Sequence, residues 1–121
     1  LNEKPQDSRA WYYLGLSYLE KGQYAEAEKA LYKALPNADY YWKEDMLRQL
    51  ARVYVKTSDY DRALEQYDRL LKEYPKAVSD WTDRGLVCVY IGSYQEALQN
   101  FKKAIKLEKD KHQRNSRSPY Y

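Results

Sequence analysis

One sequence pattern occurs three times in this chain of 121 residues, and this repetition constrains the fold more than any other feature. Trp, Gly, Gly, Tyr, Glu and Ala appear in the same order, at the same offsets, in residues 11–27 and 81–97. Residues 47–63 follow a related pattern, with Ala51 in place of the first glycine. In each unit a tyrosine precedes an alanine by three positions, at Tyr24, Tyr60 and Tyr94. A period of about 35 residues indicates an array of similar units.

Each unit has the periodicity of two helices joined by a turn. In the first unit, apolar or small residues at i, i+3, i+4 and i+7 define one helical face, namely Trp11, Leu14, Gly15 and Tyr18. Gly22 then interrupts the pattern, and helical spacing resumes at Ala27. No stretch alternates with period two for long, so no sheet is expected.

The repeated small residues allow close packing of helices. Gly15, Ala51 and Gly85 allow two helices to approach closely, while a large neighbour such as Trp11 or Phe101 fills the space beside them. One helical hairpin cannot bury its apolar face alone, so neighbouring hairpins must share a core.

These residues resemble the tetratricopeptide repeat, a helix–turn–helix motif of 34 residues. The first unit matches the family pattern at Trp11, Leu14, Gly15, Tyr18, Gly22, Tyr24, Ala27 and Ala34. The second matches it at Leu50, Ala51, Tyr54, Tyr60, Ala63, Tyr67 and Pro75, and the third at Trp81, Gly85, Gly92, Tyr94, Ala97, Phe101 and Ala104. The resemblance implies an all-α fold, a right-handed α-solenoid of three hairpins with about six or seven helices and no sheet.

The expected boundaries follow the repeats. Repeat 1 with an extended junction covers 8–43, repeat 2 covers 44–77 and repeat 3 covers 78–111. Residues 1–7 resemble the end of a preceding repeat, which suggests a fragment of a longer array. Residues 112–121 are interpreted as a polar basic tail, either disordered or derived from cloning.

The junction in residues 34–44 carries two extra residues compared with the other repeats. Pro36 should end the preceding helix, and Asp39 can cap the next one. Residues 40–42, two tyrosines and a tryptophan, would then form an added first turn. Two interpretations stay open for these aromatic residues: packing against the core, or an exposed contact patch.

Charge and cysteine usage narrow the classes of function. The first 108 residues hold 17 basic and 17 acidic residues, so the net charge of +3 comes from the end of the chain. The folded part should lack a strong field of one sign, which argues against nucleic-acid binding. Cys88 is the only cysteine, which excludes an internal disulfide and fits a reducing compartment such as the cytoplasm without fixing the location. No apolar run has the length of a membrane span.

No constellation for catalysis is apparent, so an enzyme, a cofactor and a metal are not expected. His112 is the only histidine, and it lies in the polar tail. Cys88 takes a packing position of the repeat and is predicted to be buried rather than reactive. The sequence contains no H-E-x-x-H motif, no cysteine pair for zinc and no glycine-rich phosphate loop.

The family resemblance implies that the first helix of each hairpin lines a concave groove for a peptide or a partner helix. On this chain the groove residues would be Tyr12, Tyr13, Leu16 and Leu19 from repeat 1, Arg48, Gln49, Arg52 and Lys56 from repeat 2, and Thr82, Asp83, Leu86 and Tyr90 from repeat 3. The residues of repeat 1 have an alternative role in contacting an upstream repeat.

Arg48, Arg52 and Lys56 are spaced four residues apart and therefore share one helical face. One interpretation is a solvated face that Glu44 and Asp45 partly neutralise. The other is a basic strip that pairs with carboxylates of a bound segment.

One subclass of the family binds chaperone C-terminal tails through a carboxylate clamp of Lys, Asn and Arg side chains. This chain has other residues at those places, namely Tyr12, Leu16, Gln49, Ser79 and Asp83, so that ligand is not expected. The main hypothesis is a protein-interaction scaffold for a peptide or helix with apolar and acidic residues. Self-association through uncapped repeat ends and single-stranded RNA binding are the alternatives.

Overall fold

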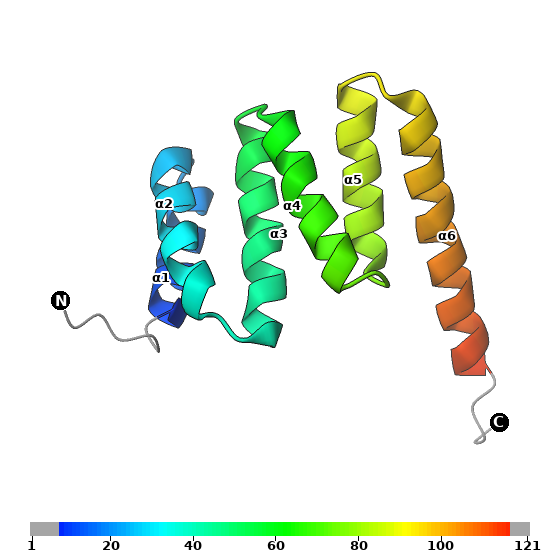
Figure 1. Ribbon diagram of the computed structural model, residues 1–121, viewed down its shortest axis with the longest axis horizontal. Coiled ribbons are helices and arrows are strands. Elements are labelled where there is room, and N and C mark those ends of the chain that lie inside the picture. The colour runs from blue at the N-terminus through cyan, green and yellow to red at the C-terminus, as the bar shows by residue number, and fades with distance from the viewer. Residues whose placement is uncertain (1–7, 117–121) are drawn as a thin grey trace. The chain divides into compact units, whose positions relative to one another are not determined.

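A computed structural model describes residues 8–116 of the chain, with side chains as far as residue 114, and this part contains helices and no strand (Figure 1). The predicted all-α fold of three consecutive hairpins is confirmed. The elements are α1 (Ser8–Glu20), α2 (Tyr24–Ala34), the 3-10 helix η2 (Leu35–Asn37), α3 (Tyr40–Lys56), α4 (Tyr60–Glu73), α5 (Val78–Tyr90) and α6 (Tyr94–Ser116). The chain forms two compact units that divide within α4, Leu1–Leu70 and Leu71–Tyr121.

The core of the first unit forms where α1 packs on α2 and α2 packs on α3. Gly15 of α1 faces Leu31 of α2, and a Cβ atom at Gly15 would lie 3.0 Å from the Leu31 Cγ atom. The two helices therefore approach as closely as the repeated small residue predicts. From α3, Met46, Leu47 and Leu50 are completely buried and complete this core.

The turns within the three hairpins have one geometry. At each turn a residue with positive φ follows the first helix: Gly22 (φ +81°), Ser58 (φ 60°) and Gly92 (φ +82°). The next residue donates its N–H to a carbonyl five positions back, as Gln23 does to Tyr18 at 2.9 Å, and this bond closes the helix end. Ser58 adopts the conformation for which the other two turns use glycine.

The junction between α2 and α3 follows the prediction. Pro36 lies in η2, directly after α2 ends, and Asp39 caps α3 by accepting a hydrogen bond from the Trp42 backbone N–H at 3.1 Å. The two interpretations of the added aromatic turn each hold for part of it. Trp42 is half-buried, whereas Tyr40 and Tyr41 are exposed and their rings contact each other.

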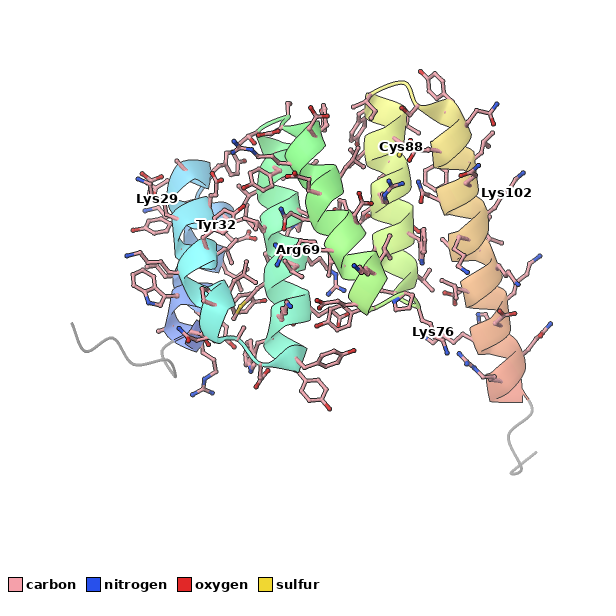
Figure 2. The ribbon with its side chains drawn as sticks, viewed as in Figure 1. Lys29, Tyr32, Arg69, Lys76, Cys88 and Lys102 are labelled. Carbon is pink, nitrogen blue, oxygen red and sulfur yellow. The ribbon has the colours of Figure 1, made fainter. Side chains whose placement is uncertain are left out.

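The second unit contains the hairpin of α5 and α6. A Cβ atom at Gly85 would lie 2.6 Å from the Phe101 ring, so this position also requires a minimal side chain. Cys88 on α5 (Figure 2) is completely buried, as predicted from its place in the repeat. The Asn100 side chain, also buried, lies 3.6 Å from the Cys88 sulfur through its Nδ2 atom.

Helix α6 continues beyond the expected end of the third repeat. Residues 112–116, which were assigned to the polar basic tail, form the end of this helix, since α6 is helical as far as Ser116. Gln113 and Arg114 have good helix propensity, and His112 lies 3.4 Å from the Glu108 carboxylate one turn earlier. Residues 1–7 and 117–121, which include the expected lead-in and the rest of the tail, lie outside the described residues.

None of the helices between residues 8 and 116 combines the length and the apolar character that a bilayer crossing requires.

Candidate peptide-binding surface

An aromatic cluster of Tyr12, Tyr13 and Trp42 joins the start of α1 to the start of α3. The ring centroids of Tyr12 and Tyr13 are 5.3 Å apart, and the Trp42 ring lies 5.5 Å from Tyr12 and 6.0 Å from Tyr13. These are distances at which tilted and edge-to-face rings attract each other. The cluster presents Tyr13, which is 54% exposed, on a support formed by the other two rings.

Two of the residues predicted to line the groove of repeat 1 belong largely to the core. Tyr12 is 6% exposed and Leu19 is 5% exposed. Tyr12 is covered because the added turn of α3 brings Trp42 against it. Burial, and then the nearby Asp45 carboxylate, raises the pKa of Tyr12, so its phenol stays protonated. Leu16 is half-buried, and Tyr13 is therefore the most accessible of the four predicted residues.

The expected basic strip on α3 divides into two parts. Arg48 donates to Glu44 and to Asp45, each at 2.9 Å, so the neutralised interpretation is correct for this residue. Arg52 and Lys56 are exposed, and no carboxylate in residues 8–116 lies within ion-pair distance of either. Arg52 instead donates to the Gln49 side-chain oxygen at 2.7 Å.

A cavity of about 270 Å³ lies where the turn between α1 and α2 meets α3. Its lining residues come from all three elements: Leu19, Glu20, Lys21, Gly22, Tyr24, Arg52 and Lys56. Three of these side chains carry a positive charge and one carries a negative charge, so the cavity suits an anion. Leu19, Arg52 and Lys56 were predicted site residues, and the structure brings them together here.

The predicted residues of repeat 3 lie on α5 in the second unit. Leu86 and Tyr90 are exposed, whereas Thr82 and Asp83 are half-buried. The Thr82 hydroxyl donates to the Val78 carbonyl at 3.1 Å within its own helix. This face therefore offers two apolar side chains and few unused polar groups.

Sequence reasoning did not identify Lys21 and Tyr24 as site residues. Tyr24 was assigned to packing because it recurs in all three repeats, and Lys21 stands beside the turn glycine. The available signal was a cation directly before Gly22, since the turn of one hairpin lies near the first helix of the next. Within residues 8–116, no group of three or more His, Cys, Asp or Glu side chains is placed to hold a metal ion.

The chain belongs to the tetratricopeptide repeat family. Two models of this family match it, one over residues 6–76 and the other over residues 50–116. The matched ranges together span the described helices, and they agree with the repeated pattern of packing residues. No curated protein sequence matches the chain.

Solved structures with the same fold include a crystal structure of MamA, with a TM-score of 0.83 and 25% identity over 91% of this chain. The chain spans 63% of that MamA chain and 57% of a second one, which is 26% identical with a TM-score of 0.79 over 88% of this chain. The second tetratricopeptide domain of Spaghetti (RPAP3), bound to the HSP90 peptide SRMEEVD, has a TM-score of 0.74 and 17% identity, with 85% of this chain and 94% of that domain covered. The Sgt2 domain from Aspergillus fumigatus has a TM-score of 0.75 and 22% identity, covering 84% of this chain and 66% of that one.

Proposed function

We propose that this chain is a protein-interaction module that binds an extended peptide or a helix of a partner protein on the surface formed by α1 and α3. One observation carries the proposal: the aromatic cluster spans α1 and the start of α3, and Arg52 and Lys56, which have no ion-pair partner within residues 8–116, lie further along α3. An apolar anchor beside a charged subsite is the usual composition of a peptide-binding surface.

The spacing of the two features predicts how far apart the apolar and acidic residues of the ligand lie. Helices α1 and α3 run in the same direction (Figure 1), and Trp42 and Arg52 are ten positions apart on α3. At 1.5 Å per residue the two features are therefore separated by about 15 Å. An extended peptide spans about 3.4 Å per residue, so its apolar and acidic residues should be about four or five positions apart.

The Spaghetti domain shows that a protein of this fold can hold a peptide, in that case SRMEEVD. We do not expect this chain to bind the same peptide, because the places of the carboxylate clamp carry Tyr12, Leu16, Gln49, Ser79 and Asp83. The expected ligand instead combines a leucine or aromatic residue with an acidic residue, and Tyr13 contacts the apolar one.

The test is selection of a random twelve-residue peptide library, displayed on phage, against the immobilised chain. Selected peptides should share an apolar and an acidic position at the spacing derived above. Tyr13→Ala should weaken a selected peptide by about tenfold, as is typical of an aromatic anchor. Tyr94→Ala is the matched control, because Tyr94 is also exposed but lies on α6. Loss of binding with both variants, or selection of peptides without a shared pattern, would reject this surface.

Self-association is a second candidate, favoured by one observation on the second unit. Tyr94, Leu98 and Ile105 are exposed on α6 at a spacing that places them along one side of the helix. Exposed apolar side chains in a row favour association with another surface. Sedimentation equilibrium over a concentration series should show a monomer–oligomer equilibrium that Leu98→Glu shifts to the monomer. A monomer at all concentrations would exclude this candidate.

A further inference from the structure

The cavity at the turn between α1 and α2 has a charge pattern that the repeat fold does not require. Lys21, Arg52 and Lys56 supply three positive charges, and Glu20 supplies the only negative charge, which leaves a local net charge of +2. All four side chains are exposed, and none forms an ion pair within residues 8–116. Like charges gathered in this way repel each other, so an anion bound among them would be stabilised.

The helix ends explain only part of this pattern. Lys56 is in the last turn of α3 and Lys21 follows α1, so each lies near the carbonyl end of a helix, where a cation is favourable. Arg52 is one turn further inside α3, and the dipole effect fades within the last turn. The helix dipole therefore does not explain why Arg52 lines the cavity.

The cavity also has hydrogen-bond donors to hold a tetrahedral anion. Arg52 uses Nη1 to donate to Gln49, which fixes the guanidinium and leaves its other N–H groups for a ligand. The ammonium groups of Lys21 and Lys56 provide further donors, and the phenol of Tyr24 provides a neutral one. Gly22 has no side chain, and the space where its Cβ would be is open, with no heavy atom within 4 Å.

We propose that this pocket binds the phosphate group of a phosphorylated side chain in the partner peptide, and this inference rests on the proposed function. A phosphate ester carries a charge of about −1.5 to −2 at pH 7 and has three acceptor oxygens. A carboxylate carries one charge and two oxygens. The local charge of +2 and the excess of donors match the phosphate better than a single Asp or Glu side chain.

The direct test is an NMR titration of the 15N-labelled 121-residue chain with three probes. These are N-acetyl-O-phosphoserine methylamide, N-acetylglutamate methylamide and inorganic phosphate. The phosphoserine compound should shift the amide signals of Lys21 and Gly22 saturably, and the glutamate compound should bind at least about tenfold more weakly. Equal affinity for the two compounds would overturn the proposal. Binding of inorganic phosphate without binding of phosphoserine would also overturn it, because the pocket would then hold a free anion.

Matched variants distinguish specific binding in the cavity from general electrostatic attraction of an anion to basic side chains. Arg52→Gln combined with Lys56→Gln should weaken phosphoserine binding by about tenfold or more, since two charge-assisted hydrogen bonds are lost. Lys102→Gln with Lys103→Gln removes the same charge from exposed positions of α6, where Figure 2 shows Lys102, and should leave the affinity unchanged. Equal weakening by both pairs would reduce the site to diffuse electrostatics and contradict the proposal.

The failure of this inference and the failure of the proposed function give different results. Tyr13→Ala should weaken binding of a selected peptide by about tenfold but leave phosphoserine binding intact, because Tyr13 does not line the cavity. Peptide selection without phosphoserine binding would reject the phosphate pocket alone. Phosphoserine binding without peptide selection would reject the aromatic surface alone.

Discussion

The hairpins α1–α2 and α5–α6 share one sequence pattern, seventy positions apart, but different side chains pack against the repeated small residue in each. In the first hairpin Gly15 faces the aliphatic Leu31. In the second, Gly85 faces the flat and rigid ring of Phe101, and a Cβ atom would come 0.4 Å closer to it than in the first (2.6 Å against 3.0 Å). The repeat therefore fixes a close approach of two helices, while the partner of the small residue is free to vary.

The second difference is polar. Arg84 and Asn100 of the second hairpin stand where Leu14 and Ala30 stand in the first. Arg84 donates to the Asn100 oxygen at 3.4 Å and lies 3.2 Å from Glu96, and Asn100 donates to the Glu96 carbonyl at 2.8 Å. No buried side-chain nitrogen or oxygen in the described residues lacks a partner. A polar side chain can therefore occupy a buried position of the repeat when all of its hydrogen bonds are satisfied.

The largest expected effect comes from filling the close approach. Gly85→Ala should lower the free energy of unfolding by about 2 kcal/mol, because overpacking against the Phe101 ring exceeds the gain in helix propensity. Gly15→Ala should lower it by less than about 1 kcal/mol, since the Leu31 side chain can shift. Urea unfolding measures both values. Adding Phe101→Leu to Gly85→Ala should recover most of the loss, and equal losses at the two glycines would contradict the role assigned to the ring.

A smaller effect is expected when the polar group of the second hairpin is removed. Asn100→Ala should lower the free energy of unfolding by about 1 to 2 kcal/mol, because it removes one acceptor of Arg84 and the bond to the Glu96 carbonyl. Arg84→Leu makes the second hairpin more like the first. The double variant should lose less than the sum of the single variants, as expected for residues in contact. Strict additivity in a double-mutant cycle would show that the two side chains act independently.

In the first unit the buried Tyr54 side chain makes its hydrogen bonds between two hairpins rather than within one. The Tyr54 hydroxyl of α3 donates to Glu28 at 2.6 Å and lies 2.8 Å from the hydroxyl of Tyr32 on α2 (Figure 2). Tyr54→Phe should lower the free energy of unfolding by about 1 kcal/mol in urea unfolding at pH 7. Glu28→Gln keeps an acceptor and should have a smaller effect.

The Tyr54 phenol should make the free energy of unfolding depend on pH in the alkaline range. Burial, followed by the hydrogen bond to Glu28, raises the pKa of Tyr54 far above its usual value. The unfolded chain releases this phenolic proton near pH 10 and the folded chain retains it, so the free energy of unfolding should fall as the pH rises above about 10. The slope should reach about 1.4 kcal/mol per pH unit from this residue. Tyr54→Phe should remove that part of the slope, and an unchanged slope would contradict the assignment.

The smallest expected effect concerns the turn between α3 and α4, where Ser58 takes the place of the glycine found in the turns of the two compared hairpins. Ser58→Gly should raise the free energy of unfolding by about 0.5 to 1 kcal/mol, because it relieves a positive φ that both hairpins give to glycine. Gly22→Ser should lower it by a similar amount, and the added side chain would meet nothing within 4 Å. Thermal unfolding monitored by circular dichroism detects both shifts. A loss of stability with Ser58→Gly would mean that the serine side chain stabilises the turn.

Local features of the fold were predictable from the sequence. The helix starts and the turns depend on residues within one or two turns of each other, as with Pro36, Asp39 and Gly22. The neutralisation of Arg48 by Glu44 and Asp45 also follows from i, i+4 and i, i+3 spacing. These properties are set along the chain, so a single sequence specifies them.

The site was only partly predictable, because helical spacing shows which residues share a face but not what covers that face. Tyr12 was expected to be available to a ligand, yet Trp42 from thirty positions away buries it. Lys21 and Arg52 line one cavity because a turn of one hairpin meets a helix of the next. The continuation of α6 beyond residue 111 was missed because the segment has no apolar face.

The complete burial of Cys88 makes it a built-in reporter of opening in the second unit. It is the only thiol in the chain, so every molecule that reacts with a maleimide or with Ellman's reagent must first expose α5. The labelling rate in the native state would then report how often this hairpin opens, without any substitution. A fluorophore could also be attached to a cysteine introduced on the surface, while the natural one stays protected as long as the protein remains folded.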